Sequence, residues 1–117
     1  MRMGDIMSSD KRRQTRKDVA TRLAVVDVNT GTEIGDLANI SNEGFMVLAR
    51  RAVPAHSVFQ LSLLLPRLIH GVDTLYFGAE SLWCNAAEDG GHYWIGFHLI
   101  DISPQDSEVL ALLLESV

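Results

Sequence analysis

From residue 22 to residue 100, strand-like stretches and turn signals follow one another at short intervals. The stretches are rich in β-branched residues or alternate between apolar and polar residues, as strands with one buried face do. They cover residues 22–28, 32–40, 45–49, 57–65, 74–84 and 92–100. Pro66 is expected to end the fourth stretch, and a loop is expected around Gly71. Six consecutive short strands predict an antiparallel meander that closes into a small β-barrel.

The apolar period changes after these stretches, near the C-terminus. Ser103 suits a helix N-cap, Pro104 suits the first helical position, and Asp106 lies three residues after the cap. Leucines and a valine between residues 109 and 114 then form an apolar face at helical spacing. The predicted fold class is therefore all-β with a C-terminal helix over 103–115. That helix is expected to cover one barrel opening or to contact a partner.

The length and composition are typical of one domain with one core. The chain has 117 residues, of which 47% are hydrophobic. The single cysteine, Cys84, excludes an internal disulfide. No stretch approaches the roughly 20 apolar residues of a membrane span, and residues 1–10 do not resemble a signal peptide. These observations predict a cytoplasmic protein without membrane insertion.

The basic residues are concentrated near the N-terminus. The net charge is −5, yet six of the ten lysines and arginines lie between residues 11 and 22. We divide the chain into a leader (1–10), a basic arm (11–20), a barrel (21–101) and the helix. A short basic arm on an acidic body predicts one compact anionic partner, because a long nucleic acid usually meets a broader basic face.

Two motifs stand out, in this order. Residues 12–16 read RRQTR, an R-x-x-x-R pattern, and residues 39–44 read NISNEG, an [D/N]-x-S-x-x-G pattern. Further similar segments are LSLLLP at 61–66, SLW at 81–83 and GFHLIDIS at 96–103. With their order and spacing, these segments resemble the PilZ domain family over about residues 11–114. Asn39 stands where the family more often has Asp, Leu99 where Phe is usual, and Ser81 where Val is usual.

This resemblance implies a six-stranded PilZ-type barrel that binds cyclic di-GMP. It implies a receptor or adaptor that changes conformation on ligand binding and signals to an unidentified effector protein in bacterial motility, biofilm or exopolysaccharide control. The ligand-binding residues that it implies are Arg12, Arg13, Arg16, Asn39, Ser41 and Gly44, with Trp83 as an additional candidate. The resemblance allows one or two ligands per chain. It also allows either a monomer or a homodimer.

The chemistry of a cyclic guanine dinucleotide suits these residue types. An arginine fork can donate two hydrogen bonds to guanine O6 and N7, stack on a purine, and pair with phosphate. Arg12 and Arg16 would lie about 13 Å apart in an extended chain. Asn39 and Ser41 are two positions apart, so we expect both on one face of a strand. Gly44 is expected to allow a tight turn or a close approach.

Simpler interpretations accompany each motif. The arm could be a solvated basic tail, residues 39–44 could serve only as a turn, and core packing is the favoured role for Trp83. The four histidines and Cys84 show no metal-ligand spacing, and no catalytic residues or phosphate-binding loop stand out. We therefore expect no metal, no cofactor and no enzyme. The alternative functions are a PilZ-like protein-interaction domain without ligand and a nucleic-acid-binding β-barrel.

Overall fold

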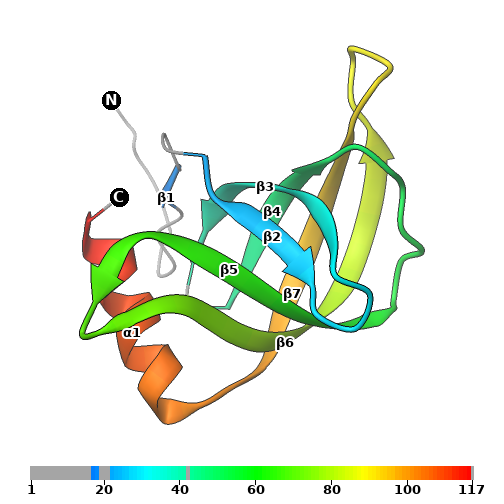
Figure 1. Cartoon of the computed structure of the whole chain (residues 1–117). Helices are drawn as coiled ribbons and strands as arrows, with labels where there is room; N and C mark the ends of the chain where they lie inside the picture. The colour runs from blue at the N-terminus through cyan, green and yellow to red at the C-terminus, as the bar shows by residue number, and fades with distance from the viewer. Residues whose placement is uncertain (1–16, 19–21, 42, 117) are drawn as a thin grey trace, which may run out of the picture.

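The computed structural model describes residues 17–18, 22–41 and 43–116. Within these residues, seven strands precede one helix (Figure 1). The strands are β1 (Lys17–Asp18), β2 (Ala24–Asp27), β3 (Thr32–Ile40), β4 (Gly44–Ala49), β5 (Val58–Ile69), β6 (Val72–Ala86) and β7 (Tyr93–Ile102), and the helix is α1 (Pro104–Ser116).

Strands β2 to β7 form a closed antiparallel barrel. They are neighbours in the order β3-β2-β5-β6-β7-β4, and β4 also pairs with β3, which closes the sheet. The predicted six-stranded barrel with a C-terminal helix is thus confirmed. The predicted meander is wrong, because β4 and β5 follow each other in sequence but are not neighbours. Strand β4 pairs with β3 on one edge and with β7 on the other, so it has no free edge for β5.

Alternate side chains of each strand fill the barrel interior, as expected for strands with one buried face. The Phe45 and Phe97 rings stack with their centroids 4.9 Å apart. Phe59 meets Phe97 edge-on at 5.9 Å, and Phe45 meets Phe77 in the same way at 5.4 Å. These contacts link β4, β5, β6 and β7 across the interior, and such aromatic pairs stabilise a core beyond their buried area.

Helix α1 closes one end of the barrel, at the lower left of Figure 1. It packs against β5 and β6 and buries Val109, Leu110 and Leu113. The Ser103 hydroxyl accepts a hydrogen bond from the Asp106 backbone N–H at 3.1 Å, which satisfies a free donor of the first turn. The cavity left between barrel and helix has about 10 Å³, so it is too small for a ligand.

Strand β5 continues through Pro66, so the expectation that this proline ends the strand is wrong. β2 pairs only with residues 61–63 of β5, and the register between β5 and β6 shifts between Leu64 and Ile69. Pro66 therefore lies where β5 has no regular hydrogen-bonded pairing with a neighbouring strand, and its missing N–H costs no hydrogen bond of the sheet. The loop expected around Gly71 is a two-residue turn, in which His70 and Gly71 have φ of 52° and 76°. Positive φ at both positions is typical of a type I′ hairpin.

Ser81 holds the segment that connects β4 to β5. Its side chain is fully buried, and its hydroxyl donates to the Pro54 carbonyl oxygen at 2.6 Å and accepts from the Ser57 backbone N–H at 3.0 Å. The backbone of Ser81 also bonds to His56 and Ser57. The serine at this position therefore fixes residues 54–57 against β6 through hydrogen bonds that a valine side chain could not make.

We expect Ser81→Ala to lower the free energy of unfolding by about 1–3 kcal/mol, because polar groups of the 54–57 segment would lose a buried partner. Urea denaturation followed by circular dichroism measures this change. Ser62→Ala is the matched control, since Ser62 lies on β5 with its side chain half-buried, and its effect should stay within about 0.5 kcal/mol. Equal stability of the two variants would contradict the role given to Ser81.

Candidate ligand-binding site

The turn between β3 and β4 is built around Ser41. Its backbone N–H donates to the Gly44 carbonyl oxygen at 2.9 Å, and its hydroxyl donates to the same oxygen at 3.2 Å. The hydroxyl also lies 3.4 Å from the Glu43 backbone N–H. Ser41 is 2% exposed and borders the small cavity beneath α1. Its side chain thus stabilises the turn from the inside.

Gly44 brings this turn into close contact with β7. A Cβ built at Gly44 would overlap the carbonyl oxygen of Phe97. Beside it, the Leu99 backbone N–H donates to the Glu43 carbonyl oxygen at 2.8 Å. The absence of a side chain at residue 44 therefore permits the approach of two backbones, as expected for a glycine at such a place.

Asn39 lies on the outer face of the barrel, in a row that crosses four strands. Its Cα partner on β4 is Met46, the partner of Met46 on β7 is Gly96, and the partner of Gly96 on β6 is Trp83. The Asn39 side-chain amide lies 3.5 Å from the Met46 sulfur. With strands about 4.8 Å apart, the row spans about 14 Å from Asn39 to Trp83. We call Asn39, Met46, Gly96 and Trp83 the outer row.

Asn39 and Ser41 do not share a face, contrary to the expectation from their spacing. The register of β3 and β4 shifts between Leu37 and Asn39, which marks a bulge. Strand β3 ends at Ile40, and Ile40 and Ser41 are both buried. The alternation of a regular strand therefore does not extend to Ser41.

Trp83 lies outside the core, so the favoured expectation of core packing is wrong. The register of β6 and β7 shifts between Ser81 and Trp83, and this shift leaves Leu82 and Trp83 exposed, at 42% and 37%. A Cβ at Gly96 would overlap atoms of the Trp83 indole, so the ring lies directly over Gly96. An indole supported from below and exposed above is a surface on which a base can stack.

Strand β1 brings the end of the basic arm to the outer row. Lys17 and Asp18 pair with Ile40 and Asn39 on β3. Arg12, Arg13 and Arg16 themselves lie outside the described residues. In sequence, Arg16 directly precedes Lys17, so the first motif adjoins the strand that pairs with the second motif.

Apart from Lys17 of β1, the described residues near the outer row offer no lysine or arginine without a partner. Arg22 is engaged with two carboxylates of β3, with Nε at 2.9 Å from Asp36 and Nη2 at 3.5 Å from Glu33. The hydrogen bond with Asp36 is the main reason that the pKa of Arg22 lies above its usual value. Farther along the same strands, Glu80 of β6 lies opposite His98 of β7 in the register of the sheet. An anionic ligand at the outer row would need positive charge from the basic arm, of which Lys17 lies beside the row.

The structure thus brings Asn39 and Trp83 onto one face and places Ser41 and Gly44 in the turn beside it. Sequence reasoning did not identify Met46 and Gly96, which complete the row. Strict alternation along the stretch 45–49 would have placed Met46 on the opposite face from Phe45 and Val47, and this is the sequence signal that could have identified it. Among the described residues, no group of three or more His, Cys, Asp or Glu could hold a metal ion. In that same part of the chain, no helix is long and apolar enough to cross a membrane.

Solved structures with the same fold include those of three bacterial proteins. The chain matches the PilZ domain of Escherichia coli YcgR with cyclic di-GMP at a TM-score of 0.67 and 15% identity, covering 92% of this chain and 91% of that one. It matches the Bacillus subtilis inhibitor of motility MotI/DgrA at 0.66 and 17% identity, and K. pneumonia MrkH in complex with cyclic di-GMP at 0.66 and 14%. The match with MotI/DgrA covers 87% of this chain and 48% of that protein. The match with MrkH covers 93% of this chain and 55% of that protein. The chain thus spans about half the length of these two proteins.

No curated protein sequence matches the chain. The sequence profile of the PilZ domain, in contrast, matches residues 10–116, which include the arm, every strand and the helix. With a barrel and a C-terminal helix that superpose on PilZ structures, this match leads to one conclusion: the chain belongs to the PilZ domain family.

Proposed function

We propose that this chain is a receptor for cyclic di-GMP that works by binding, without catalysis, and signals to a partner protein. The observation that carries the proposal is the pairing of β1 with β3, because it joins the arginine motif to Asn39 on the outer face. Two of the structures that share the fold, those of YcgR and MrkH, contain cyclic di-GMP. MotI is described as an inhibitor of motility, which supports motility among the processes that such a receptor would control.

The outer row offers two kinds of contact to such a ligand. Asn39 can donate from its amide and accept at its oxygen, so it can bond to a guanine edge. Trp83 can stack on a guanine base, because its indole is exposed above Gly96. We assign Ser41 and Gly44 to positioning, since they build the turn that follows Asn39.

The phosphates of the ligand require the arm. The described groups near the outer row include the carboxylates of Asp36 and Glu80 but no free guanidinium, as Arg22 is engaged. Arg12, Arg13 and Arg16 would supply the positive charge and the paired donors that phosphate and guanine both accept. The roughly 13 Å between Arg12 and Arg16 in an extended arm is similar to the span of the outer row.

Ligand binding would then change the surface beside the barrel. In the proposed mechanism the arm closes over the ligand, and an effector protein in the bacterial cytoplasm recognises the closed state. The division into a leader (1–10), a ligand-binding arm (11–20) and a barrel with its helix belongs to this proposal. So do the absence of nucleic-acid partners and the absence of membrane insertion.

Isothermal titration of cyclic di-GMP into the full chain tests the function directly. We expect saturable binding with Kd in the micromolar range or tighter, and no comparable heat with GTP, which has one guanine and a linear triphosphate. The titration also gives the number of ligands per chain. If the folded protein binds no cyclic di-GMP, the receptor proposal fails and the alternative of a ligand-free protein-interaction domain replaces it.

A further inference from the structure

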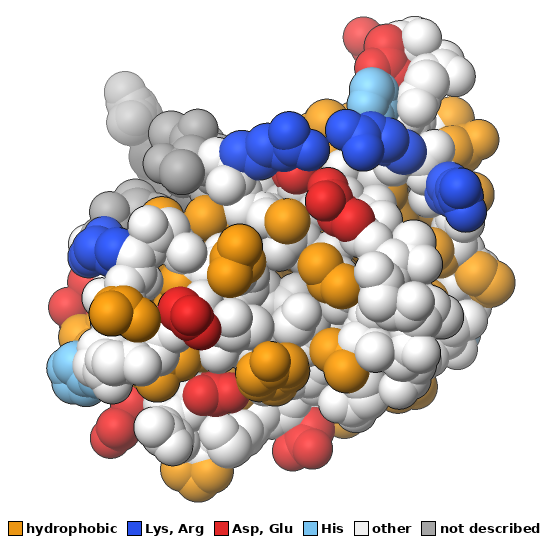
Figure 2. Space-filling model, in the orientation of Figure 1, with side chains coloured by type: hydrophobic (Ala, Val, Ile, Leu, Met, Phe, Trp, Pro, Cys, Tyr) orange, Lys and Arg blue, Asp and Glu red, His pale blue; other side chains and the backbone are white. Residues whose placement is uncertain are grey.

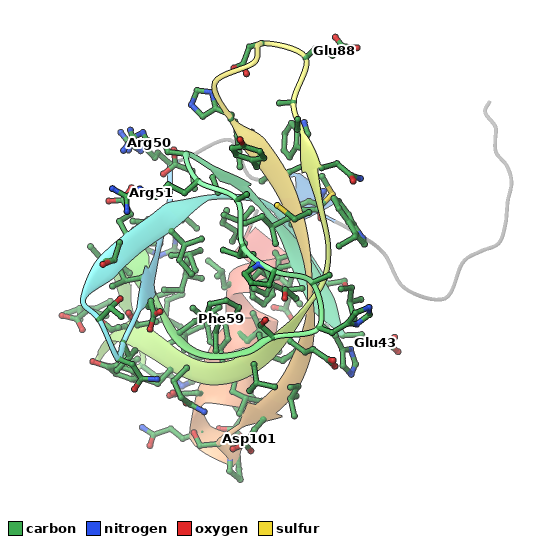
Figure 3. The ribbon with its side chains drawn as sticks, turned by 90° about the vertical axis from the view of Figure 1, so that its right-hand side faces the viewer. Glu43, Arg50, Arg51, Phe59, Glu88 and Asp101 are labelled. Carbon is green, nitrogen blue, oxygen red and sulfur yellow. The ribbon has the colours of Figure 1, made fainter. Side chains whose placement is uncertain are left out.

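The barrel end away from α1 is open and contains a pocket of about 340 Å³. Figure 3 looks into this end, with Phe59 inside the ring of strands and Arg50 and Arg51 at its edge. The lining comes from the β2–β3 hairpin, the start of the β4–β5 connection and the start of β5. Its residues are Asp27, Thr30, Thr32, Glu33, Ile34, Arg50, Arg51, Ala52, Val53 and Phe59. None of them belongs to the outer row or to the 41–44 turn.

The inner part of the pocket is apolar. Ile34, Val53 and Phe59 pack against the core yet remain half-buried, because the helix that the structure describes lies at the other end. Phe59 is fixed by its edge-on contact with Phe97 at 5.9 Å. The opposite end differs, since α1 leaves only about 10 Å³ there. The open end therefore keeps a formed apolar surface in a concave site, which is where barrels hold small ligands.

The charged groups at the rim differ in whether they have partners. Asp27 accepts the Asn29 backbone N–H at 2.9 Å, and Glu33 lies 3.5 Å from Arg22. Arg50 and Arg51 are exposed, and no ion pair joins them to any of the described residues. The two available groups at the rim are thus guanidinium groups. Figure 2 also shows Lys and Arg side chains along the upper edge of the molecule, above a face where acidic and apolar groups alternate.

We propose that this pocket binds a small organic carboxylate with an apolar body, such as an aryl or short acyl acid. The carboxylate would pair with Arg50 and Arg51, whose planar forks match its two oxygens. The apolar body would lie on Phe59, Ile34 and Val53. The lining itself carries two guanidinium groups and two carboxylates, and the Arg22 guanidinium near Glu33 is shared with Asp36. The selectivity for an anion therefore rests on Arg50 and Arg51, which lie at the rim without an ion pair to the described residues. A volume near the lower limit of ligand pockets, roughly 300–1,000 Å³, suits a molecule of this size.

The test is a titration of the isotope-labelled full chain with 3-phenylpropanoate, followed by amide chemical shifts. We expect saturable shifts at the pocket residues with Kd of about 1 mM or tighter. Two probes separate the contributions of charge and body. 3-Phenylpropan-1-ol has the same body without the charge, and acetate has the charge without the body, so each should bind at least about tenfold more weakly.

Variants locate the site and keep it distinct from the outer row. The double variant R50Q/R51Q should bind 3-phenylpropanoate at least about tenfold more weakly. R67Q removes an exposed arginine that lies outside the pocket and should bind like the wild type. Both variants should keep the affinity of the wild type for cyclic di-GMP, whatever that affinity is. Absence of saturable shifts at the pocket overturns the proposal, and so does equal binding of the alcohol or undiminished binding by R50Q/R51Q.

Discussion

Replacing Arg12 with alanine should weaken the binding of cyclic di-GMP about 5- to 150-fold. A bidentate arginine contact with guanine is worth about 1–3 kcal/mol, and each 1.4 kcal/mol is a factor of ten in affinity. Lys17 lies beside the outer row but lacks the planar fork of an arginine, and Arg22 is engaged with Asp36 and Glu33, so no described residue near the row replaces the Arg12 guanidinium. Isothermal titration of the variant beside the wild type measures the loss.

Two further variants serve as controls for the effect of Arg12→Ala on cyclic di-GMP affinity. Arg12→Lys keeps the charge but not the fork, so its affinity should fall between those of wild type and Arg12→Ala. Arg67→Ala removes an exposed arginine that lies beside α1 residues in a shallow depression, and it should bind cyclic di-GMP as the wild type does. Thermal denaturation should show equal stability for all three variants. If Arg12→Ala binds like Arg67→Ala, the arm is only a solvated tail.

The barrel was predictable because local patterns determine most of it. Strands such as Thr32–Ile40 are bounded by turn residues, and the N-cap at Ser103 fixes the start of α1. The strand order was not predictable in the same way. Each strand of a small barrel must satisfy two edges, and whether β4 pairs with β5 or β7 depends on contacts distant in sequence. Local alternation reports which face of a strand is buried but carries no information on its neighbours.

In the candidate site, too, some features were predictable from local sequence and others were not. The motif residues could be identified from the sequence, but their roles depend on two bulges. A register shift before Asn39 turns its side chain outward, while Ser41 is buried in the turn. A second shift between Ser81 and Trp83 places the indole over Gly96 on the outside. A bulge adds one residue to one strand and reverses the faces that follow it, so an alternation argument fails beyond it.

Gly44→Ala should lower the free energy of unfolding by about 3 kcal/mol. The added Cβ would overlap the Phe97 carbonyl oxygen, and overpacking of this kind costs about 1–3 kcal/mol or more. The upper part of that range applies here because the obstacle is backbone in the β4–β7 ladder, in which Gly44 pairs with His98. At Gly96 the obstacle is the Trp83 side chain, which can rotate away. Chemical denaturation of wild type and variant measures the difference.

The matched control is Gly91→Ala, at the tip of the β6–β7 hairpin. There the nearest atom to an added Cβ is Asp89 Oδ1 at 4.0 Å, and the change should stay within about 0.5 kcal/mol. Gly44→Ala should also weaken cyclic di-GMP binding where it remains folded, because a displaced turn moves the adjoining end of β3 and with it Asn39. Stability equal to that of Gly91→Ala would mean that the turn can shift away from β7. The assignment of Gly44 to positioning would then fail, and a direct contact of its backbone with ligand would become the better explanation of the motif.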